Sequence, residues 1–140
     1  MNGKTRQVEL RLAKIPYIGF IAVHYWFVIV HNTTKCDRWE IWQNRNRGGE
    51  NWGHLHQNLM GAYNGVGNGE SCREYTWHGK TAEKLIRVIE ESKDNYPYCY
   101  VYRYFPGPNS NTYVAWVLDK AEVDYSLGRK GIGKRYCELR

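Results

Sequence analysis

The chain lacks the features that would place it at once in several common classes of protein. None of its four cysteines forms a C-x-x-C pair, so a structural zinc site has no support. The apolar stretch from Ile15 to Val30 contains Pro16, Gly19 and His24. It is shorter than the roughly 20 apolar residues that a membrane-spanning helix needs. It also lies too far from the start for a signal peptide and has no small-residue cleavage site. We therefore expect one or two buried strands there and a cytoplasmic protein.

Signals for phosphate and nucleic-acid binding are missing as well. The glycines between Gly61 and Gly69 are not followed by Gly-Lys-Ser/Thr, so this segment is a loop or hairpin tip and not a phosphate cradle. The net charge is +6, and no recognised nucleic-acid-binding motif accompanies it. This charge favours either a solvated basic face or an anionic partner such as a polymer. The excess of cations lies near the two ends of the chain, at Lys4, Arg6, Arg11, Lys14, Arg129, Lys130, Lys134, Arg135 and Arg140.

The composition is that of one ordinary globular domain spanning residues 1–140. Hydrophobic residues make up 42% and charged residues 24% of the 140 positions, which is enough for a single core. Phenylalanine is scarce, with three copies against twelve tyrosines and six tryptophans, and tyrosine and tryptophan suit a partly wet groove. An even number of cysteines permits two disulfides, but a domain of this size does not need them. We favour free thiols, and the pairing stays open for Cys36, Cys72, Cys99 and Cys137.

Periodicity and turn residues predict a small antiparallel sheet packed against two helices, an α+β fold. Strands are expected over Val8–Leu12, Phe20–Val30 and Arg38–Gln43, and the last two form a hairpin around the turn Asn32–Lys35. Loops are expected over 44–53 and 61–69. The clearest helix is Thr81–Asp94, with Thr81 as its cap. Residues 111–118 follow as a second helix, although their Tyr, Val and Trp content leaves a strand open.

The most informative segment is Pro106-Gly107-Pro108-Asn109-Ser110-Asn111-Thr112. Two prolines and a glycine stop the preceding element, and three residues that favour helix N-caps then lead into an apolar run. This order predicts that Ser110 lies at a helix N-terminus, where backbone N–H groups stabilise a developing anion. Asn109 or Ser110 could equally serve only as a cap.

A serine needs a base before it can act as a nucleophile, and His24 is the strongest candidate among the five histidines. It stands in the middle of an apolar strand, where an imidazole is costly unless it is partnered or useful. Glu40 or Gln43 on the returning strand could orient the ring, and alternation favours Glu40. A core histidine and a surface carboxylate are the competing interpretations. His54 and His56 lack a third metal ligand, so we expect no metal or other cofactor.

Several of these segments together resemble an uncharacterised bacterial domain family with a Pro-Gly-Pro-Asn-Ser-Asn-Thr-aromatic motif. The other shared elements are His24-Tyr25-Trp26, Arg38-Trp39-Glu40 and Ile132-Gly133-Lys134, so the resemblance covers most of the chain. The family brings no established activity. No cysteine suits a thiol mechanism: Cys99 precedes Ser110 by eleven positions and Cys36 lies near a hairpin turn, so both are expected to be structural.

A looser resemblance is to circularly permuted papain-like hydrolases, such as relatives of lecithin:retinol acyltransferase and NlpC-type cell-wall peptidases. These begin a strand with His-Tyr and place their nucleophile later, at a helix start, as His24-Tyr25 and Asn109-Ser110 are placed here. Their nucleophile is cysteine, whereas this chain has Ser110. The resemblance implies a hydrolase or acyltransferase acting on an amide or ester of a peptide, cell-wall or lipid acyl substrate. A non-catalytic binding module for an anionic polymer or a protein is the alternative.

In the enzyme interpretation each named residue has a role. Ser110 attacks, His24 exchanges the proton and Glu40 orients the imidazole. The side-chain amide of Asn109 or Asn111, with backbone N–H groups near Ser110, holds the oxyanion. Three aromatic residues are expected to wall the substrate site: Trp26, Trp42 and Tyr104.

Overall fold

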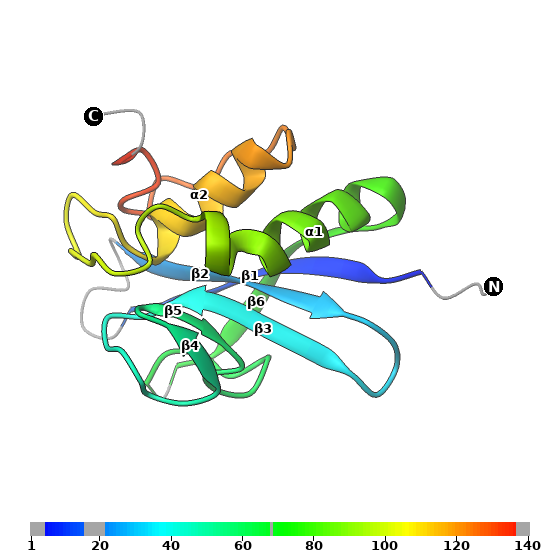
Figure 1. The fold of residues 1–140 in the computed structure, drawn as a ribbon, viewed down its shortest axis with the longest axis horizontal. Coiled ribbons are helices and arrows are strands. Elements are labelled where there is room, and N and C mark those ends of the chain that lie inside the picture. The colour runs from blue at the N-terminus through cyan, green and yellow to red at the C-terminus, as the bar shows by residue number, and fades with distance from the viewer. Residues whose placement is uncertain (1–4, 16–21, 68, 137–140) are drawn as a thin grey trace.

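One antiparallel sheet of six strands carries two helices on one of its faces (Figure 1). The computed structural model describes residues 5–15, 22–67 and 69–136. The strands lie in the order β4-β5-β3-β2-β1-β6, and every neighbouring pair is antiparallel. The predicted α+β class is therefore confirmed. The elements are β1 (Gln7–Lys14), β2 (Val23–Val30), β3 (Cys36–Ile41), β4 (Glu50–Trp52), β5 (Leu55–Gln57), β6 (Ser71–Trp77), α1 (Gly79–Asn95) and α2 (Ser110–Lys120).

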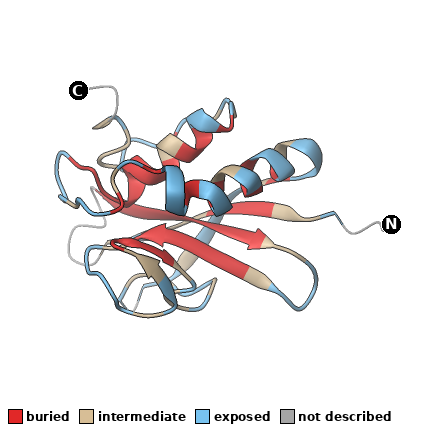
Figure 2. Ribbon diagram, in the orientation of Figure 1, coloured by how far each residue is buried: buried red, intermediate tan, exposed pale blue. Residues whose placement is uncertain are grey.

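The central strand β2 is buried on both faces, which explains its continuous apolar sequence (Figure 2). Tyr25, Phe27 and Ile29 join the main core with α1 and α2. On the opposite face, Trp26 and Val28 form a smaller cluster, against which the loop after β5 packs. His24 shares this second face by the alternation of side chains along a strand.

The predicted hairpin of β2 and β3 is confirmed, but its ladder is short. It pairs Phe27–Val30 with Cys36–Trp39 and ends there. The last residues of β3, Glu40 and Ile41, pair only with β5. The start of β2 is therefore without a β3 partner, and this is the end of the sheet at which the start of α2 lies.

Both predicted helices are present, with different starts. The first begins at Gly79 and not at Thr81, and its N-cap is His78, whose side chain makes no capping hydrogen bond. The prediction that Thr81 is the cap is therefore wrong. The second covers Ser110–Lys120, so the alternative of a strand there is excluded. Its buried residues face the sheet and α1, which overrides the β-branched and aromatic content that favours a strand.

Other boundaries shift by a few residues. The returning strand starts earlier than predicted and ends at Ile41, so Trp42 and Gln43 lie beyond it. The predicted loop 44–53 contains the short strand β4. The predicted first part of the β2 strand, Phe20 and Ile21, and the bend at Pro16 and Gly19 fall outside the described residues. Within the described part of the chain, no helix is long and apolar enough to cross a membrane.

Candidate functional site

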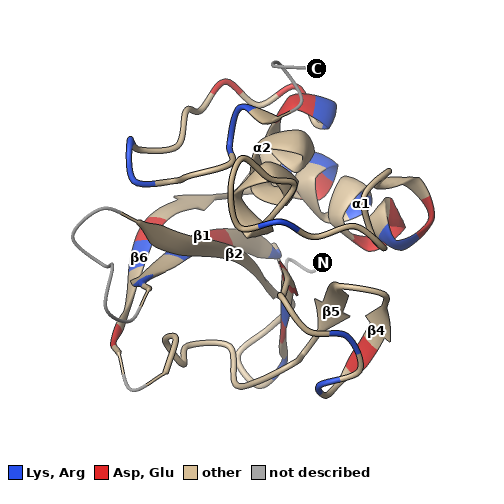
Figure 3. Cartoon of the chain, turned by 90° about the vertical axis from the view of Figure 1, so that its left-hand side faces the viewer, with Lys and Arg blue, Asp and Glu red and all other residues tan. Residues whose placement is uncertain are grey.

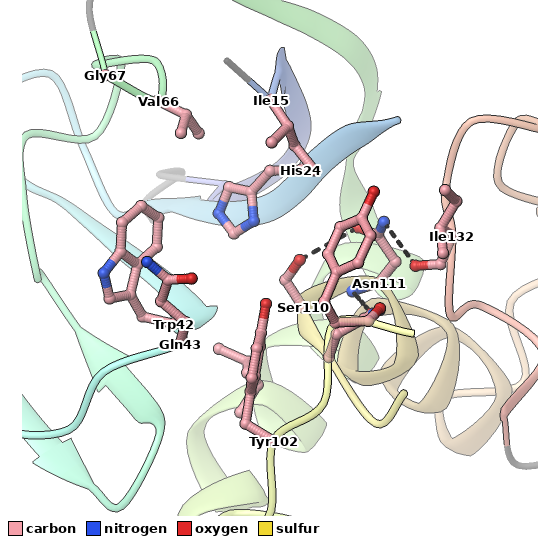
Figure 4. Close-up of a pocket in the computed structure, with 13 residues that line it drawn as sticks. Ile15, His24, Trp42, Gln43, Val66, Gly67, Tyr102, Ser110, Asn111 and Ile132 are labelled. Atoms are coloured by element: carbon pink, nitrogen blue, oxygen red, sulfur yellow. Dashed lines mark hydrogen bonds between the residues drawn. The ribbon is translucent and has the colours of Figure 1, made fainter. Parts of the chain in front are cut away.

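A cavity of about 300 Å³ opens where β2 begins, β3 ends and α2 starts (Figure 4). The His24 ring and the Ser110 hydroxyl, which are far apart in the sequence, face this same space. The start of α2 carries no charged residue (Figure 3). The described residues that line the cavity are Ile15, His24, Ile41, Trp42, Gln43, Val66, Gly67, Tyr102, Tyr104, Asn109, Ser110, Asn111 and Ile132.

His24 is held by Glu40 from the neighbouring strand. The distance between His24 Nε2 and Glu40 Oε1 is 2.8 Å, and both side chains are buried. Glu40 is in turn bound by Arg38, which donates from Nε to Oε2 and from Nη2 to Oε1. The imidazole, the carboxylate and the guanidinium thus form one buried chain of hydrogen bonds.

The charge state of Glu40 fixes the tautomer of His24. Burial by itself raises the pKa of this carboxyl, but the hydrogen bonds and charges of His24 and Arg38 outweigh it, and the pKa is lowered. An ionised carboxylate only accepts hydrogen bonds, so Nε2 of His24 carries the proton. In the neutral ring Nδ1 is then an acceptor, and no described residue forms a hydrogen bond with it.

Arg38 and Trp26 form the support beneath this pair. Arg38 is fully buried and also donates from Nη1 to the carbonyl groups of Gly61 and Asn64, at 2.9 and 2.7 Å. Its guanidinium lies 3.9 Å from the centre of the Trp26 ring, and Trp26 stacks on His24. Trp26 has no exposed surface and is not part of the cavity lining. We therefore revise its expected role from substrate wall to support for the imidazole.

The Pro-Gly-Pro-Asn-Ser-Asn-Thr segment forms a capping box at the start of α2. The Asn109 side chain accepts from the backbone N–H groups of Asn111 and Thr112, and Thr112 Oγ1 lies 3.0 Å from the Asn109 backbone nitrogen. Asn109, and not Ser110, is therefore the cap. Ser110 occupies the first helical position, and its hydroxyl takes no part in the capping box. Among the described residues the hydroxyl makes only one long contact, 3.4 Å to Asn111 Oδ1.

Asn111 fixes the helix start against β2 at the point where β3 no longer pairs with it. Its Oδ1 accepts from the Tyr25 backbone N–H at 3.0 Å, and its Nδ2 donates to the carbonyl groups of Val23 and Ile132 at 2.9 and 3.0 Å. The Asn111 side chain thus makes the hydrogen bonds to the start of β2 that a residue of β3 would make if the ladder continued. Both of its N–H groups are occupied, so none remains for an oxyanion.

Ile132 and Gly133, near the C-terminus, bind the start of α2. Thr112 Oγ1 donates to the Gly133 carbonyl at 2.6 Å. Gly133 has φ +97°, and a Cβ there would lie 2.3 Å from Asn109 Nδ2 and Oδ1. Only glycine permits this approach. The Asn109 Nδ2 group itself donates to the Tyr104 carbonyl at 2.6 Å, so this amide also has a structural role.

The structure brings most of the predicted site residues to one place. Ser110, His24, Trp42, Tyr104, Asn109 and Asn111 line the cavity, and Glu40 lies directly behind His24. No described residue hydrogen-bonds both Ser110 and His24, and no hydrogen bond joins these two directly. Sequence reasoning assigned no role in the site to Arg38 or Tyr102. Strand alternation places Arg38 on the face of Glu40, and this shared face is the signal that could have indicated its role.

The other described histidines and cysteines are not among the lining residues, although the His54 ring packs against Tyr102, which is one of them. Nδ1 of His54 lies 2.9 Å from the Trp42 carbonyl, and Nδ1 of His56 lies 3.0 Å from the His54 carbonyl. No group of three His, Cys, Asp or Glu in residues 5–15, 22–67 and 69–136 is placed to hold a metal ion. Cys36, Cys72 and Cys99 are free thiols, and Cys137 lies outside the described residues.

Comparison with known proteins gives a family and no activity. No curated protein and no solved structure matches the chain. One family model matches residues 5–136, which is nearly the whole chain. It includes the His24, Glu40 and Ser110 segments described above. The chain therefore belongs to the family described as protein of unknown function, DUF3750.

Proposed function

We propose that the protein is a hydrolase or acyltransferase of the permuted papain-like type, which cleaves an amide or ester bond with Ser110 as nucleophile. The observation that carries this proposal is the shared cavity: a serine at a helix N-terminus faces a histidine that a buried carboxylate orients. Neither a structural cap nor a core histidine requires this combination. A cap would need only Asn109, and a core histidine would not face a cavity.

The proposed reaction begins with proton transfer. Ser110 Oγ attacks the carbonyl carbon while its proton passes to His24 Nδ1, and Glu40 stabilises the imidazolium that forms. The proton then moves to the leaving nitrogen or oxygen as the bond to the carbonyl carbon breaks. Water, or an acceptor alcohol or amine in the acyltransferase case, attacks the acyl-enzyme and restores Ser110.

The serine must turn toward the ring before it reacts. Its contact with Asn111 Oδ1 is long, at 3.4 Å, so little is lost when it leaves. Rotation about the Ser110 side-chain bond moves the hydroxyl without moving the helix. Such loose contacts are common in catalytic groups that have no substrate bound.

The oxyanion is assigned to groups other than the two asparagine amides. The Ser110 backbone N–H lies at the N-terminus of α2, where the helix dipole favours negative charge, and the Asn109 side chain caps the next two N–H groups instead. Tyr102 and Gln43 line the same cavity, and no described residue hydrogen-bonds their side chains. Burial raises the pKa of Tyr102, so its hydroxyl stays protonated and able to donate.

A serine-reactive fluorophosphonate probe tests this proposal. We expect labelling of the native protein, and loss of labelling in both Ser110→Ala and His24→Ala. Ser126→Ala and His78→Ala are matched controls, because both residues are exposed and lie outside the cavity lining. Ser110→Cys should react with thiol-directed probes at the same site.

Absence of labelling in the folded native protein contradicts the enzyme proposal. It favours the non-catalytic binding module, in which the Asn-Ser-Asn segment only caps α2. In that case Ser110→Ala and His24→Ala should leave binding of an anionic polymer unchanged.

A further inference from the structure

The cavity wall is apolar away from the reacting groups. The side chains of Ile15, Ile41, Val66 and Ile132 line it together with the Trp42 ring. No Asp, Glu, Lys or Arg is among the lining residues that the structure describes, and the Nε2 of His24 is bound to Glu40. We propose that the acyl group entering this cavity is uncharged and apolar, as in a fatty acyl ester or amide, and is not a carboxylated cell-wall peptide. This inference rests on the proposed function.

The polar groups of the cavity include no lysine or arginine that could pair with a carboxylate, among the residues that the structure describes. The Asn109 and Asn111 amides bind backbone groups. The side chains of Tyr102 and Gln43 remain free to donate, but the proposed reaction uses them at the oxyanion, at the other end of the acyl chain. Arg38 does not line the cavity and is held by Glu40 and two loop carbonyls. A carboxylate on the acyl chain would therefore lose its water without gaining a cation, which is unfavourable.

The size of the cavity fits an acyl chain better than a peptide. A volume of about 300 Å³ is at the small end of ligand pockets. Tyr104, which lines the cavity, is 39% exposed and so extends its wall to the surface. A charged peptide finds no Asp, Glu, Lys or Arg of opposite charge among the described lining residues.

Two chromogenic esters of equal length provide the test. We compare 4-nitrophenyl hexanoate with the 4-nitrophenyl monoester of adipic acid, which replaces the terminal methyl group of the chain with a carboxylate. We expect kcat/KM for hexanoate to exceed that for the adipate ester by a factor on the order of 100, since the buried carboxylate would be unpaired. Ser110→Ala supplies the background rate for both esters.

A positive charge placed in the wall should weaken the preference for the uncharged ester. Val66 is half-buried and lines the cavity, so Val66→Arg adds a cation next to the chain. We expect the ratio of hexanoate to adipate kcat/KM to fall at least tenfold in this variant. Val101→Arg is the matched control, because Val101 is 42% exposed and does not line the cavity, and its ratio should equal that of the native protein.

The possible failures can be told apart. If Ser110 is required for turnover but the adipate ester reacts as well as hexanoate, the inference is overturned and the proposed function stands. If neither ester reacts and the fluorophosphonate does not label Ser110, the proposed function is overturned. A binding measurement on Ser110→Ala then decides the inference: hexanamide, and not the monoamide of adipic acid, should shift the His24 and Trp42 ring signals in NMR spectra. Equal shifts from both amides overturn it.

Discussion

Arg38 does not line the cavity, yet its removal should greatly lower the free energy of unfolding. In Arg38→Met the Glu40 carboxylate keeps His24 but loses a guanidinium that binds both of its oxygens, and all three groups are buried. Leaving one partner of a buried ion pair without the other costs about 3–5 kcal/mol. Glu40→Gln leaves the Arg38 charge unpaired and should cost a similar amount. The double variant removes both charges, and its cost should be about 2–3 kcal/mol below the sum of the two single costs.

Urea denaturation followed by tryptophan fluorescence measures these free energies of unfolding, provided that the slope with urea is unchanged. The chain offers a control pair in Arg6 and Glu83, whose side chains are 34% and 52% exposed and 2.7 Å apart. Their coupling should stay below about 1 kcal/mol. A coupling between Arg38 and Glu40 as small as that between Arg6 and Glu83 would refute the reasoning.

Three further predictions concern the segments around the site. Gly133→Ala should cost about 2 kcal/mol or more, because the new Cβ would lie 2.3 Å from the Asn109 amide, whereas Gly79→Ala, at φ +61° with open space around it, should cost only about 1 kcal/mol in strain. Equal melting temperatures for the two variants would contradict this. Asn111→Asp places a carboxylate oxygen against two backbone carbonyls and should cost about 1–3 kcal/mol in urea denaturation; a change smaller than about 0.5 kcal/mol would show that the amide is dispensable. Burial raises the pKa of the Cys99 thiol to about 11, so in a variant whose only cysteine is Cys99 iodoacetamide should react at pH 8 only after unfolding. Since this pKa lies above that of an unfolded thiol, about 8.5, the associated stability is complete below pH 8.5 and is lost as the pH rises toward 11. Rapid alkylation of the folded variant would show that the thiol is accessible.

Strong local patterns allowed the central part of the fold to be predicted. The alternation in β1, the turn between β2 and β3 and the apolar spacing of α1 are all set by residues close together in the sequence. The three missed strands lack such a pattern. Two of them, β4 and β5, have three residues each, and β6 is an edge strand whose middle residues are exposed. The pairing of β5 with β3 and of β6 with β1 joins segments that are distant in the sequence, and among the described strands β4 pairs only with β5.

The candidate site also contains residues that a local pattern predicts and residues whose roles depend on distant contacts. Strand alternation was sufficient to choose Glu40 as the partner of His24. Two parts of the site could not be foreseen because they depend on tertiary contacts. Arg38 binds carbonyl groups of a loop more than twenty positions away, and the Asn111 amide bonds to β2, 86 positions before it. The different roles of Trp26 and Trp42 also depend on tertiary packing, because the Trp26 ring stacks on His24 and is fully buried, whereas Trp42 meets His24 edge-on and lines the cavity.

The position of Ser110 is set by its neighbours and not by its own side chain. Asn109 caps the helix, and Asn111 bonds directly to the backbone N–H of Tyr25, the residue after His24. One amide therefore links the residue following the serine to the residue following the histidine. A thiol at position 110 would inherit the same placement, so the choice between hydroxyl and thiol alters the reactivity of the site and not its geometry. Ser110→Cys should therefore fold as the native chain does, with an unchanged free energy of unfolding in urea, while its reactivity toward thiol-directed probes rises.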